Sequence, residues 1–162
     1  MNIFEKVFRE LNRAKVKYLI VGGVAVNLHG YLRFTGDIDI LLLLEEGNFE
    51  RMDRAMKKLG YQERLPVSIF SLKDHKQIKK WLKEKNMTAY SFVPTDHSLM
   101  TIDVLTEKSI KFTDFSAKRI LKKLGKIYIP VVSIADLIKM KKEAGRDQDL
   151  IDLKFLQQLE NL

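Results

Sequence analysis

Residues 19–44 read LIVGGVAVNLHGYLRFTGDIDILLLL: a short apolar run, two adjacent glycines, and a longer apolar run interrupted by two aspartates. The first run, Tyr18–Val21, predicts a buried strand that ends at Gly22-Gly23, and Val24–His29 predicts the helix that follows. Asp37–Leu44 predicts a second strand. Because its residues are apolar on both faces, we expect this strand in the centre of a sheet.

Asp37 and Asp39 stand two residues apart, so on a strand their side chains point to the same face. Two carboxylates on a buried strand are costly unless their charge is compensated. Divalent cations compensate it well, since Mg²⁺ prefers hard oxygen ligands. A structural alternative stays open, in which Asp37 caps the start of the strand and Asp39 pairs with Arg33.

The Gly22-Gly23 pair stands where a strand turns into a helix. Such a turn exposes backbone N–H groups at the positive end of the helix dipole, which suits a phosphate group. Taken alone, two glycines usually mark only a tight turn. Together with the paired aspartates, they predict a site for a metal-bound triphosphate.

Asp103 is the third candidate. It lies in Leu99–Leu105, which we expect to pair antiparallel with Thr88–Val93. A single aspartate on a half-exposed strand is ordinarily just solvated. A cluster of three carboxylates, however, is what two cations about 3.5–4 Å apart require in phosphoryl transfer.

The rest of the chain alternates helices and strands without strict βαβ order. Asn2 is expected to cap a first helix, Ser71–Asp74 to open another in a capping-box pattern, and Gly125 to sit in a hairpin. The further predicted elements are a helix over residues 49–59, a helix from Ser133 to Ala144 and a last helix over Asp147–Leu159. We therefore predict an α+β fold, a mixed β-sheet flanked by helices with further helices at the C-terminus, in a single domain spanning residues 1–162.

Composition sets limits on function. The chain has no cysteine, which excludes disulfides and cysteine-ligated metals, and its 29 Lys and Arg exceed 21 Asp and Glu, giving a net charge of +8. A basic surface favours nucleotides, nucleic acid or anionic membranes as partners. No apolar run is long enough to span a bilayer, so we expect a soluble cytoplasmic protein. Two lysine-rich segments, 73–85 and 111–126, suit RNA, although such faces are usually only solvated.

These residues resemble the nucleotidyltransferase superfamily that includes DNA polymerase beta. The resemblance rests on Val21-Gly22-Gly23, a spacer of thirteen residues, Asp37-Ile38-Asp39-Ile40 and Ile102-Asp103-Val104. The longer string from Gly22 to Asp39, with Arg33 and Thr35, is similar to the small prokaryotic branch of abortive-infection and toxin-like enzymes. A looser C-terminal signature runs from Lys141 through Ala144-Gly145-Arg146 to Asp149 and Asp152.

The resemblance implies roles for individual residues. Asp37, Asp39 and Asp103 would be catalytic and would bind two Mg²⁺ ions, with Mn²⁺ as a possible substitute, and Asp103 could help deprotonate the acceptor. The implied nucleotide-binding residues are Gly22, Gly23, Arg33, Thr35, Lys141 and Asp152. Gly23 replaces a serine found in many relatives, so this chain would use backbone donors there. For Arg33, Arg146 and Asp149, purely structural ion pairs are an open alternative.

The implied reaction transfers a nucleoside monophosphate from a nucleoside triphosphate to an acceptor hydroxyl and releases pyrophosphate. The acceptor could be RNA, a protein or a small molecule, and the basic surface favours RNA or protein. A toxin-like enzyme would imply an antitoxin partner. The rival hypothesis is a non-catalytic nucleotide- or RNA-binding module on the same scaffold.

Overall fold

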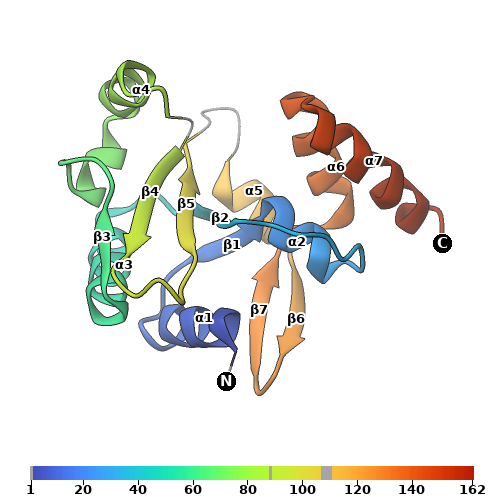
Figure 1. Cartoon of the computed structure of the whole chain (residues 1–162), viewed down its shortest axis with the longest axis horizontal. Coiled ribbons are helices and arrows are strands. Elements are labelled where there is room, and N and C mark those ends of the chain that lie inside the picture. The colour runs from blue at the N-terminus through green and yellow to red at the C-terminus, as the bar shows by residue number, and fades with distance from the viewer. Residues whose placement is uncertain (1, 88, 107–110) are drawn as a thin grey trace.

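The computed structural model describes residues 2–87, 89–106 and 111–162, and it is built around one seven-stranded mixed sheet (Figure 1). The strands are β1 Tyr18–Val21, β2 Asp37–Leu42, β3 Tyr61–Glu63, β4 Ala89–Pro94, β5 Thr101–Leu105, β6 Ile120–Leu124 and β7 Ile127–Val131. Their order across the sheet is β3-β4-β5-β2-β1-β7-β6. The strand predicted to be central, β2, is therefore the middle strand.

The helices of the described residues are α1 Ile3–Arg13, α2 Gly22–Leu28, α3 Glu46–Leu59, α4 His75–Glu84, α5 Phe112–Ala117, α6 Ile134–Ala144 and α7 Asp147–Glu160, with a 3₁₀ helix, η1, at Ile69–Lys73. The C-terminal pair α6 and α7 pack against each other on one side of the molecule, orange to red in Figure 1. The predicted α+β class, with helices around a mixed sheet and further helices at the C-terminus, is confirmed. None of the described helices is both long and apolar enough to cross a membrane.

The pairing of β2 places the aspartates. β2 runs antiparallel to β1, with Val21 opposite Asp39, and parallel to β5, with Asp39 opposite Asp103. The predicted antiparallel pair is β4 and β5, in which Ser91 is opposite Asp103. Thr88, the predicted first residue of β4, lies outside the described residues.

Burial along β2 follows the predicted alternation at its start. Ile38 and Ile40 are fully buried, whereas Asp37 is exposed and Asp39 is half-buried. The neighbouring strand β1 is buried along its whole length. The apolar side chains therefore fix β2 in the core, while its two aspartates stay partly accessible to solvent.

Several local predictions need correction. Helix α2 begins at Gly22 and not at Val24. Helix α4 is capped by Asp74, whose side chain accepts from the backbone N–H of Gln77 at 3.1 Å. Ser71 is not that cap, since it lies within the 3₁₀ helix η1 and its hydroxyl donates to the backbone carbonyl of Ser68. The short elements β3 and α5 were not predicted.

Candidate active site

Three aspartates from two adjacent strands line one cavity. Asp37 and Asp39 come from β2 and Asp103 from β5, in register with Asp39. Residues in register on neighbouring strands point to the same face of a sheet. The cavity that all three line has a volume of about 530 Å³. The structure thus brings together three carboxylates that are up to 66 residues apart, Asp37 and Asp103 being the outer pair.

The electrostatics of the cluster favour a bound cation. Burial, followed by the negative charges of Asp103 and Asp37, raises the pKa of Asp39 to about 7, against the opposing effect of Lys141 and Arg146. Burial and Asp103 also raise the pKa of Asp37. Carboxylates whose ionised form is disfavoured by burial and by each other are stabilised by an added positive charge.

Gly22 lies directly against the Asp39 side chain. Its φ is +65°, and a Cβ atom at this position would overlap the carboxylate of Asp39. Only glycine combines that backbone conformation with so close an approach. Gly22 lines the cavity, so the first residue of α2, directly after β1, forms part of its wall.

Gly23 packs against the loop that precedes β2. It is buried, and a Cβ atom there would lie 2.5 Å from Oγ1 of Thr35 and 3.2 Å from a guanidinium nitrogen of Arg33. The hydroxyl of Thr35 donates to the backbone carbonyl of Asp37 at 3.3 Å. Gly23 therefore gives space to the loop that precedes β2, and Thr35 braces that loop.

Two cationic side chains line the same cavity from the C-terminal helices. Nζ of Lys141 lies 3.0 Å from Oδ1 of Asp149 and 2.9 Å from Oδ2 of Asp152, and Lys141 is only 6% exposed. Nε of Arg146 donates to Oδ2 of Asp149 at 2.8 Å, while most of the Arg146 side chain stays exposed. The two ion pairs fix the buried Lys141 ammonium group in position.

Arg33 and Asp152 form an ion pair and do not line the cavity. Nε and Nη2 of Arg33 each donate to one carboxylate oxygen of Asp152 at 2.8 Å. Asp152 is completely buried and also accepts from Gln148 and Lys141. The alternative in which Arg33 pairs with Asp39 is therefore wrong, whereas the ion pair between Arg146 and Asp149 is present.

Sequence reasoning missed Ser91, whose hydroxyl donates to Oδ1 of Asp103 at 2.6 Å. It also missed Met140 and Glu143 of α6, which line the cavity. Ser91 belongs to no motif, and its role follows only from the register that sets it opposite Asp103.

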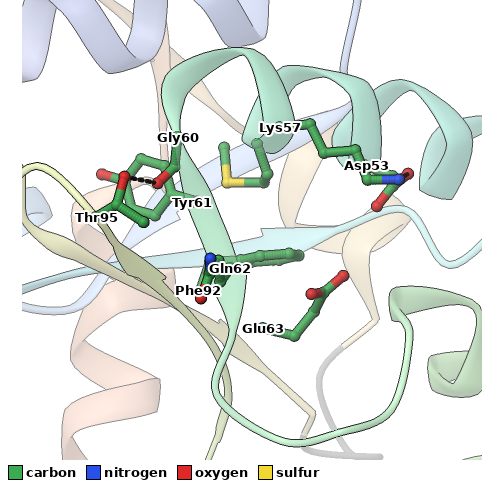
Figure 2. Close-up of a pocket in the computed structure, with 9 residues that line it drawn as sticks. Asp53, Lys57, Gly60, Tyr61, Gln62, Glu63, Phe92 and Thr95 are labelled. Carbon is green, nitrogen blue, oxygen red and sulfur yellow. Dashed lines mark hydrogen bonds and ion pairs between the residues drawn. The ribbon is translucent and has the colours of Figure 1, made fainter.

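A second cavity, of about 320 Å³, lies between the end of α3 and the edge strand β3 (Figure 2). It contains none of the predicted site residues. Its Asp53 is paired with Lys57 at 2.8 Å, and the hydroxyl of Thr95 donates to the carbonyl of Gly60. We place the candidate site in the larger cavity, because it brings together three carboxylates, Asp37, Asp39 and Asp103, that form no ion pair within the described part of the chain.

Two solved structures resemble the whole chain. No protein-family model matches the sequence, and no curated protein does. The lincosamide antibiotic adenylyltransferase LnuA, solved with lincomycin, superposes with a TM-score of 0.61 at 15% identity, over 98% of this chain and 99% of that one. The chain has the nucleotidyltransferase fold. ANT(2″)-Ia, solved with adenylyl-2″-tobramycin, shares this fold with a TM-score of 0.58 at 11% identity, over 97% of this chain and 90% of that one.

The nucleotidyltransferase fold implies magnesium, and the aspartates match that ion in part. Their oxygen donors and the raised pKa of Asp39 suit a divalent cation. Across residues 2–87, 89–106 and 111–162, however, no three acidic or histidine side chains stand in positions ready to enclose a metal. Oδ1 of Asp103 instead accepts a hydrogen bond from Ser91. A bound cation would therefore have to bring the carboxylates of Asp37, Asp39 and Asp103 closer together.

Proposed function

We propose that this chain transfers a nucleoside monophosphate from a nucleoside triphosphate to an acceptor hydroxyl and releases pyrophosphate. One observation carries the proposal: Asp37, Asp39 and Asp103 line one cavity together with Lys141 and Arg146. Carboxylates suit the metal ions and the cations suit the triphosphate, so this lining matches the two parts of a metal–triphosphate. The fold shared with two antibiotic-modifying enzymes supports the reaction class.

Each residue has a proposed task. Asp37, Asp39 and Asp103 would hold Mg²⁺, with two ions per site and Mn²⁺ as a possible substitute. The ions, when bound, would stabilise charge on the phosphates during transfer. Lys141 and Arg146 would bind the phosphates, and Gly22 would let the chain approach them.

The acceptor oxygen would attack the α-phosphorus. The bond from that phosphorus to the oxygen that bridges it to the β-phosphorus would break, and pyrophosphate would leave. The hydroxyl proton would pass to Asp103, which Ser91 holds in position by its hydrogen bond. Arg33, Thr35, Gly23 and Asp152 would support nucleotide binding indirectly, because they pack around the loop before β2.

The decisive experiment measures Mg²⁺-dependent binding of each nucleoside triphosphate by calorimetry and pyrophosphate release with candidate acceptors. Asp39→Asn should lower turnover by about 100-fold or more, as loss of a central charge-stabilising group does. Asp53→Asn is the matched control, since Asp53 lines the cavity of Figure 2 and should leave turnover unchanged. Equal turnover in wild type and Asp39→Asn would refute the proposal.

The second candidate is a non-catalytic nucleotide- or RNA-binding module. It is favoured by the bond between Ser91 and Asp103, which turns one carboxylate oxygen toward the protein. Salt-sensitive RNA binding without any Mg²⁺-dependent nucleotide binding would support this module over the enzyme.

A toxin-type role controlled by an antitoxin partner is a proposal that rests on the sequence resemblance alone. Growth arrest on expression in bacteria, abolished by Asp39→Asn and not by Asp53→Asn, would support it.

A further inference from the structure

Helix α4 carries a row of four exposed lysines, Lys76, Lys79, Lys80 and Lys83, which we call the lysine stripe. At 3.6 residues per turn the four positions fall within an arc of about 100° on the helix surface. The opposite side of α4 holds the buried residues Ile78 and Leu82. The stripe therefore faces solvent as one continuous cationic surface.

The positions of the four lysines in the stripe destabilise helix α4. The members of the stripe stand three and four residues apart, and like charges at these spacings repel. Lys76 lies in the first turn, where the helix dipole disfavours a cation, and the acidic residue at this end, Asp74, is the N-cap and accepts from the backbone N–H of Gln77. A face that is merely solvated usually mixes both signs of charge.

No member of the lysine stripe forms an ion pair with any residue in the described part of the chain. Lys73, which directly precedes the N-cap of α4, pairs by contrast with Glu46. The charge of the stripe is thus left available for a partner.

The stripe lies at the same end of the sheet as the candidate active site. Helix α4 is followed by β4, whose first residue, Ala89, lines the cavity together with Leu105 at the end of β5. Figure 1 shows α4 beside the end of the sheet where β4 begins and β5 ends. A molecule held on α4 would therefore lie at the side of the site.

We propose that the lysine stripe docks the phosphate backbone of an RNA whose hydroxyl is the acceptor in the proposed transfer. This inference rests on the proposed function for its reaction and on α4 for its partner. From Lys76 to Lys83 the stripe extends about 10 Å at 1.5 Å per residue, which is close to the rise of three nucleotides at about 3.4 Å each. RNA also supplies the hydroxyl groups that the reaction needs.

RNA fits the stripe better than an acidic protein does. Protein interfaces are centred on buried aromatic and apolar anchors, and the four positions of the stripe offer only lysine. Phosphate contacts need no such anchors and carry no sequence information. Binding by the stripe is therefore expected to depend strongly on salt and weakly on base sequence.

The test compares RNA binding by two variants that each lose two positive charges. Lys79→Gln with Lys83→Gln alters the stripe, and Lys123→Gln with Lys126→Gln alters the β6–β7 hairpin, whose turn lies at the opposite end of the molecule (Figure 1). Fluorescence anisotropy with a labelled 20-nucleotide single-stranded RNA is measured between 50 and 300 mM salt. The slope of log affinity against log salt should weaken by about 1.4 in the stripe variant, and by much less in the hairpin variant.

Three results would overturn the RNA assignment: an unchanged slope in the stripe variant, an equal loss in the hairpin variant, or equal stripe-dependent binding of polyglutamate. Calorimetry with Mg²⁺ and ATP on the wild-type protein separates this proposal from the proposed function. RNA binding that depends on the stripe, without nucleotide binding, would contradict the proposed enzymatic function and support the docking surface. Nucleotide binding, with RNA binding that is unchanged in the stripe variant, would support the proposed function and contradict the docking surface.

Discussion

Arg33 and Asp152, which are 119 residues apart in the sequence, form a two-point ion pair with both contacts at 2.8 Å. Arg33 belongs to the loop that leads into β2, and Asp152 is buried in α7. The pair fastens the C-terminal helices to the segment that positions Asp37. Since Asp152 also pairs with Lys141, one buried carboxylate links the loop before β2 to a cation that lines the cavity.

Removing the Asp152 charge should destabilise the protein strongly. Asp152→Asn leaves Arg33 and Lys141 without a full counter-charge, and breaking a buried ion pair costs about 3–5 kcal/mol. The free energy of unfolding is measured in urea. Arg9→Ala is the control, because Arg9 pairs with Glu5 within one exposed helix turn and should cost less than about 1 kcal/mol. If both substitutions lowered the free energy of unfolding equally, the buried Asp152 pair would stabilise the fold no more than an exposed ion pair does.

Gly22→Ala should abolish nucleotide binding, because the added methyl group would overlap the Asp39 carboxylate. Gly30→Ala separates this overlap from backbone strain: Gly30 also has a positive φ, of +120°, but nothing lies within 4 Å of its added Cβ. Both substitutions should lower stability, since alanine is strained at positive φ. Calorimetry with Mg²⁺ and ATP should show loss of binding for Gly22→Ala only. Retained binding there would mean that Asp39 is not needed in its present position.

Lys141→Met should raise the KM for the nucleoside triphosphate more than it lowers kcat, because Lys141 is proposed to bind phosphate in the ground state and the transition state alike. It should also destabilise the fold by roughly 3 kcal/mol, since two buried aspartates lose a partner. Lys142→Met, at the exposed next position of α6, should change neither quantity. A fall in kcat at unchanged KM would contradict the assigned role.

The ionisation of Asp39 should make stability depend on pH. Its pKa is raised to about 7 in the folded chain, primarily by burial and then by Asp103 and Asp37, against about 3.9 when unfolded. A raised pKa means that the folded state holds the proton more tightly. The contribution of Asp39 to the free energy of unfolding should therefore be highest below about pH 4 and fall as pH rises toward about 7, by at most about 1.4 kcal/mol per pH unit.

Urea unfolding in the presence of a chelator, from pH 4.5 to 8, measures this fall. The difference between wild type and Asp39→Asn isolates the contribution of this one carboxyl group. Asp149 and Asp152 do not obscure it: burial opposes their ionisation, but hydrogen bonds from Arg146, Arg33 and Lys141 lower their pKa values, so they titrate below this range. Parallel curves for the two proteins would show that Asp39 is not perturbed.

Much of the architecture was predictable because it depends on patterns within short segments. The apolar runs marked β1 and β2, and the Asp-Ile-Asp-Ile alternation put both aspartates on one face of β2. Asn2 was recognisable as the cap of α1, where its side chain accepts from the backbone of Glu5. By contrast, β3 and α5 have only three and six residues, too few for a periodic signal.

The sequence by itself determined which residues have the chemistry for a site: three aspartates on strands, glycine beside them, and basic residues near the C-terminus. Tertiary structure alone decided their partners. Parallel pairing of β2 with β5 set Asp39 opposite Asp103. The packing of α7 brought Asp152 to Arg33, so Arg33 forms its ion pair with Asp152 and not with Asp39. The physical reason is range: alternation and capping act over a few residues, whereas strand register and buried ion pairs depend on how distant segments exclude water together.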